Sequence, residues 1–149
     1  MGRARSQVRV AARLGEAEGL WYDTSRWASF VDGFARVVSA DPQWPRDGAI
    51  TWDSRPGGRG RVLERVTGWA AGDGQLAEVE DDKLTARQRV RFAAEGEEVV
   101  VGLELDYRLK RRPPGWQVVD VLFIRRALRD SLARTLQRFA IELVAEREL

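Results

Sequence analysis

Three polar residues, Glu64, Gln88 and Tyr107, occur in segments that alternate like β-strands, and each shares a strand face with apolar neighbours two positions away. A carboxyl turned inward has a raised pKa and can act as a general acid or base. An inward amide needs a hydrogen-bond partner, because burying it unpaired costs about 1–3 kcal/mol. A phenol can donate a hydrogen bond to a ligand carbonyl. These three residues are therefore our candidates for catalysis or for anchoring a ligand.

Two of the candidates also have a purely structural interpretation. If Leu63 and Trp69 face inward instead, Glu64 points outward and pairs with an arginine. Tyr107 also fits a core tyrosine whose hydroxyl is satisfied within the protein. The sequence leaves both interpretations open.

Large apolar residues accompany the polar candidates along the same predicted elements. As a set they suit contact with a flat or chain-like apolar ligand, although core packing is the commoner role for any single one. The residues expected to line an internal cavity are Trp21, Trp27, Phe30, Trp52, Trp69, Phe92, Tyr107, Leu122 and Phe123.

Arg125 lies on the predicted inward stripe of the last helix, with Arg126 beside it. A guanidinium at the mouth of a cavity could bind a carboxylate or a phosphate. The alternative is an ion pair within the protein, with Asp23 or Asp120. The sequence leaves both interpretations of Arg125 open.

The residue types that are missing narrow the chemistry. The chain has no His and no Cys, which excludes thiol nucleophiles, His-based triads and the usual structural zinc sites. Residues 80–82 are acidic but lack the spacing of a calcium loop, and the glycines of residues 57–60 join two strands rather than opening a phosphate-binding helix. We therefore expect no metal site and no cofactor.

These candidates must be positioned by a sheet and a few helices. Residues 7–13 alternate and predict a first strand, and residues 15–32 predict two short helices separated by a cap near Asp23. Turn residues then separate six further predicted strands, which makes an antiparallel meander. These strands cover residues 35–40, 49–54, 61–69, 75–81, 84–94 and 98–110.

The chain ends in a long amphipathic helix that begins after two prolines, Pro113 and Pro114. Residues 116–124 also alternate as a strand would, but their apolar stripe continues in phase into Leu128 and Leu132, so helix is the prediction. The pairs Asp130–Arg134 and Arg138–Glu142 have the spacing of ion pairs on its outer side.

Composition favours one soluble globular domain over residues 1–149. The chain is 44% hydrophobic and 32% charged, with a net charge of +2. We expect no nucleic-acid binding, because acids interleave with the arginines, and no membrane insertion, because the apolar runs are short. The basic start has no apolar segment behind it, so a cytoplasmic location is expected. Whether two copies pair as a homodimer stays open.

Three segments carry a resemblance to a known superfamily. They are LWYDTSRWASFVDGFARVV (20–38), ITWDSRPGGRGRVLERV (50–66) and RRALRDSLARTLQRFAIEL (125–143). Together with the order of the predicted elements, they resemble the START and polyketide cyclase superfamily, also called SRPBCC, which includes the birch pollen allergen type. None of the three segments is a catalytic signature.

The resemblance implies an α+β helix-grip fold: a seven-stranded antiparallel curved sheet around a long C-terminal helix, with two short helices between strands 1 and 2. It also implies a cavity between sheet and helix, which relatives use for lipids, sterols, polyketides or plant hormones. An apolar space of about a few hundred cubic ångströms is the usual size of such a pocket. We expect binding of a hydrophobic small molecule there, with a polyketide cyclase or aromatase-like enzyme as the alternative.

Overall fold

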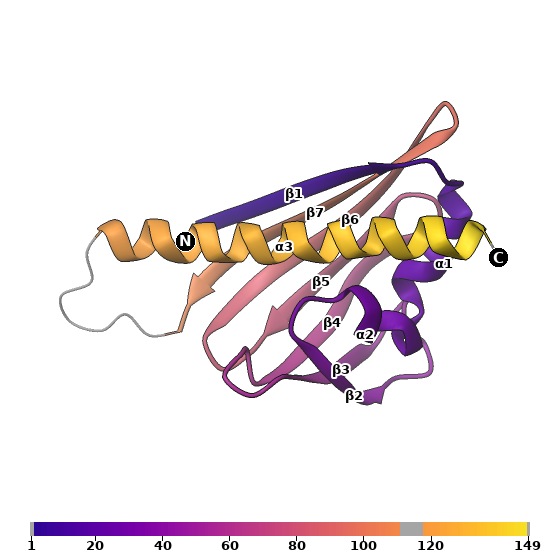
Figure 1. Ribbon diagram of the computed structural model, residues 1–149. Coiled ribbons are helices and arrows are strands. Elements are labelled where there is room, and N and C mark those ends of the chain that lie inside the picture. The colour runs from indigo at the N-terminus through magenta and orange to yellow at the C-terminus, as the bar shows by residue number, and fades with distance from the viewer. Residues whose placement is uncertain (1, 111–117, 149) are drawn as a thin grey trace.

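Seven antiparallel strands and one long helix form the computed structural model, which describes residues 2–110 and 118–148, with side chains of the last helix described from residue 121 (Figure 1). The strands are β1 (Gly2–Val10), β2 (Phe34–Ala40), β3 (Ala49–Ser54), β4 (Arg61–Ala70), β5 (Gly74–Glu80), β6 (Leu84–Glu95) and β7 (Glu98–Leu109). The helical elements are α1 (Leu14–Tyr22), the 3-10 turn η1 (Thr24–Arg26), α2 (Trp27–Phe30) and α3 (Val118–Arg147).

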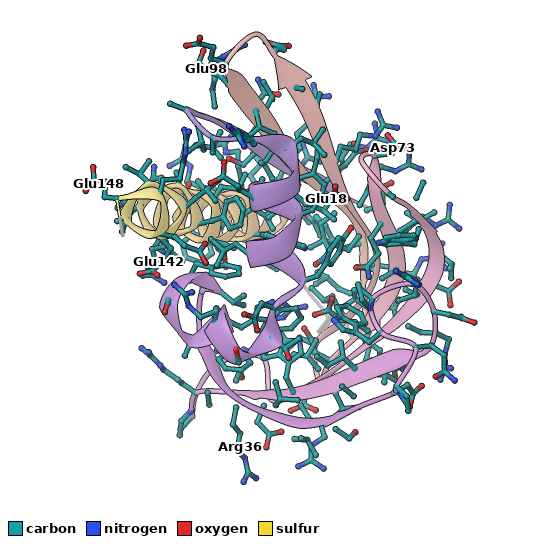
Figure 2. The ribbon with its side chains drawn as sticks, turned by 90° about the vertical axis from the view of Figure 1, so that its right-hand side faces the viewer. Glu18, Arg36, Asp73, Glu98, Glu142 and Glu148 are labelled. Carbon is teal, nitrogen blue, oxygen red and sulfur yellow. The ribbon has the colours of Figure 1, made fainter. Side chains whose placement is uncertain are left out.

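The strand order is β1-β7-β6-β5-β4-β3-β2, so the meander from β2 to β7 is completed by β1 at one edge. The segment containing α1 and α2 connects the two opposite edges of the sheet. Figure 2 looks nearly along α3 and shows the sheet curling around it, with Arg36 and Glu98 pointing away from the enclosed side. The predicted helix-grip fold is confirmed.

The first strand differs from its prediction. It begins at Gly2 rather than at residue 7 and ends at Val10 rather than at residue 13. The basic residues Arg3 and Arg5 hid this start, but they occupy the exposed face while Ala4 between them is buried. Gly2 lies opposite Tyr107 of β7, and a Cβ at Gly2 would collide with the tyrosine ring.

Strand β4 changes phase through a bulge between Val66 and Gly68. Before the bulge, Val62, Glu64 and Val66 are buried in alternation. After it, Trp69 lies opposite the buried Gln75 of β5. The bulge therefore puts Glu64 and Trp69 on the same inner face, which resolves the two phases that the sequence left open.

Helix α3 confirms the helical prediction from Val118 onward, while residues 116–117 lie outside the described residues. Its C-terminal half is anchored by fully buried Leu136, Phe139 and Leu143. By contrast, no described side chain between residues 121 and 134 is fully buried. Figure 1 shows the first turns of α3 extending past the end of the sheet.

The inward positions predicted for Leu122, Phe123 and Arg125 are wrong. Leu122 is 54% exposed, Phe123 is 71% exposed, and Arg125 is also exposed. Leu122 is six residues from Leu128, which at about 100° per residue rotates it roughly 120° off the inner face. Arg125 is closer in phase, about 60° from Leu128, yet its side chain is exposed as well.

The ion pairs predicted along α3 are replaced by longer-range ones. Asp32, just after α2, accepts hydrogen bonds from Arg134 (3.0 Å), Arg138 (3.2 Å) and Ser131 (2.7 Å). Arg26 donates to Glu142 of α3 at 2.9 Å. These contacts fasten the middle and C-terminal parts of α3 to the α2 region. Within the described ranges, none of the helices has the length and apolar character needed to cross a membrane.

Candidate functional site

A cavity of about 60 Å³ lies between the sheet, the α1–α2 region and the middle of α3. We call it the tryptophan cavity. It is smaller than the volume expected from the sequence, because four indole rings fill much of this space. Its lining consists of Trp21, Trp27, Val31, Asp32, Trp44, Trp52, Arg59, Glu64, Gln75, Gln88, Leu103, Ser131, Leu132 and Thr135.

Glu64 is the buried acid of this cavity, with only 5% of the residue exposed. Its Oε2 accepts a hydrogen bond from Trp52 Nε1 at 2.7 Å, and its Oε1 accepts one from Gln88 Nε2 at 3.3 Å. Burial raises the pKa of Glu64, and the bonds from Trp52 and Gln88 and the charge of Arg59 only partly oppose that effect. Gln88 thereby has the partner that its inward position required.

Arg59 reaches the same cavity from the hairpin between β3 and β4. Its Nε donates to Asp81 Oδ2 at 2.8 Å, and its guanidinium lies 5.6 Å from the centre of the Trp52 ring. Asp81 is held in turn by the backbone N–H groups of Lys83 and Leu84. The Nη2 of Arg59 is buried and has no acceptor among the described residues.

The indole rings form a connected wall. Trp27 packs edge-on against Trp44 (6.0 Å) and Trp52 (6.4 Å), and its Nε1 donates to the carbonyl of Trp21 at 2.8 Å. The Nε1 of Trp44 is buried without an acceptor in the described part of the chain. Gln75 donates to the carbonyl of Pro45 at 2.9 Å, which holds the loop that carries Trp44.

The structure brings together five of the residues predicted from the sequence: Trp21, Trp27, Trp52, Glu64 and Gln88. The others lie elsewhere. Phe30 is wedged between Trp21 (5.6 Å) and Phe139 (5.3 Å) in the core, and Phe92 packs against Tyr22 at 6.0 Å. Trp69 is half-buried at 5.4 Å from the guanidinium of Arg46.

Tyr107 belongs to a second group of apolar residues, beneath the N-terminal half of α3. We call this region the open end; its buried members are Ala4, Leu84, Leu105 and Tyr107, with Ala86, Leu109, Ile124, Leu128 and Leu132 packed against them. The Tyr107 hydroxyl is buried and finds no hydrogen-bond partner within the described residues. Leu132 also lines the tryptophan cavity, so the two regions are contiguous.

Sequence reasoning missed Arg59, Trp44 and Asp32. The glycines around Arg59 indicated a hairpin turn, and a turn gives no alternation from which the direction of the Arg59 side chain could be predicted. Trp44 stands in a turn rich in proline, where no periodicity marks a residue as inward. Asp81 is buried and therefore requires a cation, but the sequence does not show that burial, so it carried no signal for Arg59.

The convex face of the sheet carries a larger open depression of about 510 Å³. Across five strands its charges alternate in register from Arg65 through Glu78, Arg87 and Asp106 to Arg3. Opposite charges on adjacent strands stabilise the sheet. A surface of this kind suits solvent better than an apolar ligand.

The lining of the tryptophan cavity suits a polar group of a ligand better than a metal ion. Its lining includes two carboxyls (Asp32 and Glu64), two amides (Gln75 and Gln88) and two N–H donors that lack acceptors among the described residues, beside a wall of indole rings. In the described part of the chain, no group of three or more carboxylates lies close enough to hold a metal ion. Such a set can accept or donate a proton at Glu64 and can orient a ligand oxygen.

The amino-acid sequence matches no family model. No curated protein matches it either. Solved structures do resemble the fold. TTHA0849 from Thermus thermophilus is similar with a TM-score of 0.79 at 17% identity, covering 97% of this chain and 99% of that one.

Two further structures have the same architecture. A START superfamily protein from Mycobacterium smegmatis gives a TM-score of 0.72 at 12% identity, covering 96% of this chain and 97% of the other. The Zhui aromatase/cyclase from Streptomyces sp. R1128 gives 0.77 at 12% identity, covering 95% and 93%. At these identities the likeness establishes the fold: the chain has a START-like, polyketide cyclase-like helix-grip fold.

Proposed function

We propose that this protein binds a hydrophobic small molecule in its interior. The apolar body of the ligand lies in the open end, beneath the N-terminal half of α3, and its polar end reaches the tryptophan cavity. The observation that carries this proposal is the buried Glu64 at the wall of a cavity contiguous with half-buried apolar residues of α3. A chain that only packed its core would gain nothing from a carboxyl with a raised pKa at this position.

The tryptophan cavity is large enough for only one part of such a ligand, its polar head. A volume of about 60 Å³ has room for about four water-sized groups, which is enough for a polar head and too small for a lipid or a polyketide. The remaining contact has to come from the row Ala86, Leu105 and Tyr107 on the sheet, covered by Leu128 and Leu132. Because the described side chains in this half of α3 include no fully buried anchor, it can rise to admit a ligand at low cost.

A pair of alanine substitutions on one strand tests this placement. Ala86 faces the interior and packs against both apolar groups, whereas Ala93 faces solvent on the same strand. We expect a neutral apolar probe, 2-acetylnaphthalene or 2-ethylnaphthalene, to raise the Tm of the wild type and of Ala93→Leu. Ala86→Leu fills the space and should reduce this rise strongly. Equal ligand-induced rises in both variants would contradict the proposed site.

A polyketide cyclase or aromatase-like activity is the second candidate. Burial raises the pKa of Glu64, which suits a group that removes and returns protons near neutral pH. Zhui, whose fold is similar, is described as an aromatase/cyclase. In this alternative the interior folds a reactive chain, Glu64 moves protons, and Gln88 or Tyr107 orients a carbonyl or an enolate.

The enzyme candidate is tested with a linear poly-β-ketone thioester. Glu64→Gln keeps the shape of the side chain and removes the titrating proton, so we expect a loss of cyclisation of about 10²–10⁴-fold if Glu64 acts as acid or base. Tyr107→Phe reports on the second contact. If ligand binding is intact and neither variant changes turnover, the binding function remains and the enzymatic one is excluded.

A further inference from the structure

Two hydrogen-bond donors of the tryptophan cavity have no acceptor among the described residues. They are Arg59 Nη2 and Trp44 Nε1, and both atoms are buried. Both residues line the same small cavity. Burying a donor without an acceptor costs about 1–3 kcal/mol, and a protein that keeps two such donors at one cavity has a site prepared for an acceptor atom.

The two donors are held in place independently of any ligand. Arg59 is fixed through its Nε to Asp81 and through its contact with the Trp52 ring. Trp44 is fixed edge-on against Trp27, and Gln75 bonds the carbonyl of the next residue, Pro45. Donors that are oriented before binding lose little entropy when an acceptor arrives.

The charges around the cavity favour a neutral acceptor over an anion. The positive charge of Arg59 is already matched by Asp81, whose side chain is 1% exposed. At the other wall, Asp32 is matched by Arg134 and Arg138. Glu64 adds a carboxyl, so a ligand carboxylate or phosphate would meet further negative charge without an unmatched cation from the described lining.

We infer that the ligand presents a carbonyl oxygen, as a ketone or an amide, to Arg59 Nη2 and Trp44 Nε1. This inference rests on the proposed binding function and names the chemical class of its polar end. A carbonyl oxygen has two lone pairs and accepts two hydrogen bonds without needing an acceptor in return. Its small size fits a cavity of about 60 Å³.

Two probes that differ in one group test the inference: 2-acetylnaphthalene and 2-ethylnaphthalene. Titration calorimetry should show the wild type binding the ketone about tenfold more tightly, as expected for hydrogen bonds worth about 1.4 kcal/mol in total. With 13C at the carbonyl of the ketone, its NMR signal should move downfield on binding, because hydrogen bonds withdraw electron density from that carbon.

Three variants locate the effect. Trp44→Phe removes one N–H and keeps an aromatic ring, and Arg59→Met removes the guanidinium. Arg55→Met is the matched control, because Arg55 is an exposed arginine of the same hairpin that does not line the cavity. We expect the preference for the ketone to fall to about threefold or less in Trp44→Phe and Arg59→Met, and to persist in Arg55→Met. If Arg59→Met fails to fold, Trp44→Phe decides the matter alone.

The outcomes separate the inference from the function on which it rests. If both probes bind with equal affinity and the 13C signal stays in place, water satisfies the donors and the inference is wrong, while the proposed binding function stands. If neither probe binds, both are contradicted. An unchanged ketone preference in Trp44→Phe and in a folded Arg59→Met would also overturn it, since other groups would then hold the oxygen.

Discussion

The two halves of helix α3 cover two very different regions of the interior. Beneath the C-terminal half lies what we call the closed end, where Phe139 packs edge-on against Trp21 (5.5 Å) and Phe30 (5.3 Å). Ion pairs to Arg26 and Asp32 secure the same half. At the open end, the described side chains of α3 are at most half-buried.

We infer from this difference that the closed end supplies the stability of the fold and the open end supplies the proposed binding surface. Aromatic packing and ion pairs at the closed end fix the C-terminal half of α3 against the sheet and the α2 region. At the open end, no described side chain of α3 between residues 121 and 134 is fully buried, so a ligand can replace the contacts of this half of the helix at lower cost. The tryptophan cavity lies where the two regions meet, so a polar head bound there is held by the rigid part while the body contacts the adaptable part.

The largest expected effect comes from breaking the closed end. Phe139→Ala removes a fully buried ring and should lower the free energy of unfolding by about 3–5 kcal/mol. Leu128→Ala, at the half-buried open end, should cost about 1–2 kcal/mol, because less surface is lost. Urea unfolding measures both. Equal losses would mean that the two halves of α3 are packed equally tightly, which would contradict the difference described above.

The pH dependence of stability tests the cavity between the two ends. Burial raises the pKa of Glu64 above its ordinary value of 4.5, so the folded protein retains this proton to higher pH than the unfolded chain. The carboxyl therefore stabilises the fold below pH 4.5, and this contribution is lost as the pH rises through the raised pKa. Relative to Glu64→Gln, the wild type should lose up to about 1.4 kcal/mol per pH unit in that window.

Unfolding curves for wild type and Glu64→Gln between about pH 4 and pH 8 provide the measurement. Parallel dependence on pH in the two proteins would show that Glu64 titrates in the folded state as it does in the unfolded chain. That result would contradict the inward, desolvated carboxyl on which the binding and enzyme proposals both depend.

A smaller effect is expected from loosening the connection between α2 and α3. Burial raises the pKa of Asp32, but hydrogen bonds from Arg134 and Ser131 and the charges of Arg134 and Arg138 outweigh it, so the net pKa is lowered. Asp32→Asn should cost about 1–2 kcal/mol at neutral pH, and less as the pH falls through the pKa of Asp32 and the wild type loses the same charge. Asp130→Asn, which changes an exposed acid of α3, is the control and should have little effect.

The smallest effect is predicted for the Tyr107 hydroxyl at the open end. Tyr107→Phe removes a buried hydroxyl that has no partner in the described part of the chain, so stability should change by less than about 0.5 kcal/mol or rise slightly. Thermal unfolding checks this directly. A loss above about 1 kcal/mol would indicate that the hydroxyl is satisfied inside the protein, as in the structural interpretation of this residue.

Helices and strands were predicted well from the sequence wherever apolar residues occupy one face of the element without interruption. The alternation of β7, with Val99, Val101 and Leu103 inward, was sufficient to place that strand. Local patterns could not predict the bulge after Val66, which turns both Glu64 and Trp69 inward. They also could not predict where the sheet stops supporting α3, and this is why Leu122 was expected inside.

The site was partly predictable for the same reason. Glu64 and Gln88 could be recognised because each is a polar residue on a strand face that is otherwise apolar. The hydrogen bond between them could not be predicted, because it joins residues 24 positions apart. Arg59 and Trp44 come from turns, where side-chain direction depends on tertiary packing and not on period. The ion pairs were not predictable for the same reason. Arg134 and Arg138 pair with Asp32, more than 100 residues away in the sequence, instead of with near neighbours on α3.

The proposed binding mode places an apolar molecule in the open end with its polar group in the tryptophan cavity. A crystal structure of the protein purified from its own host, or grown with 2-acetylnaphthalene, tests it most directly. We predict continuous ligand density against Leu105 and Tyr107, ending within hydrogen-bond distance of Arg59 and Trp44. An interior filled only by protein side chains, or a ligand bound on the convex face instead, would contradict it.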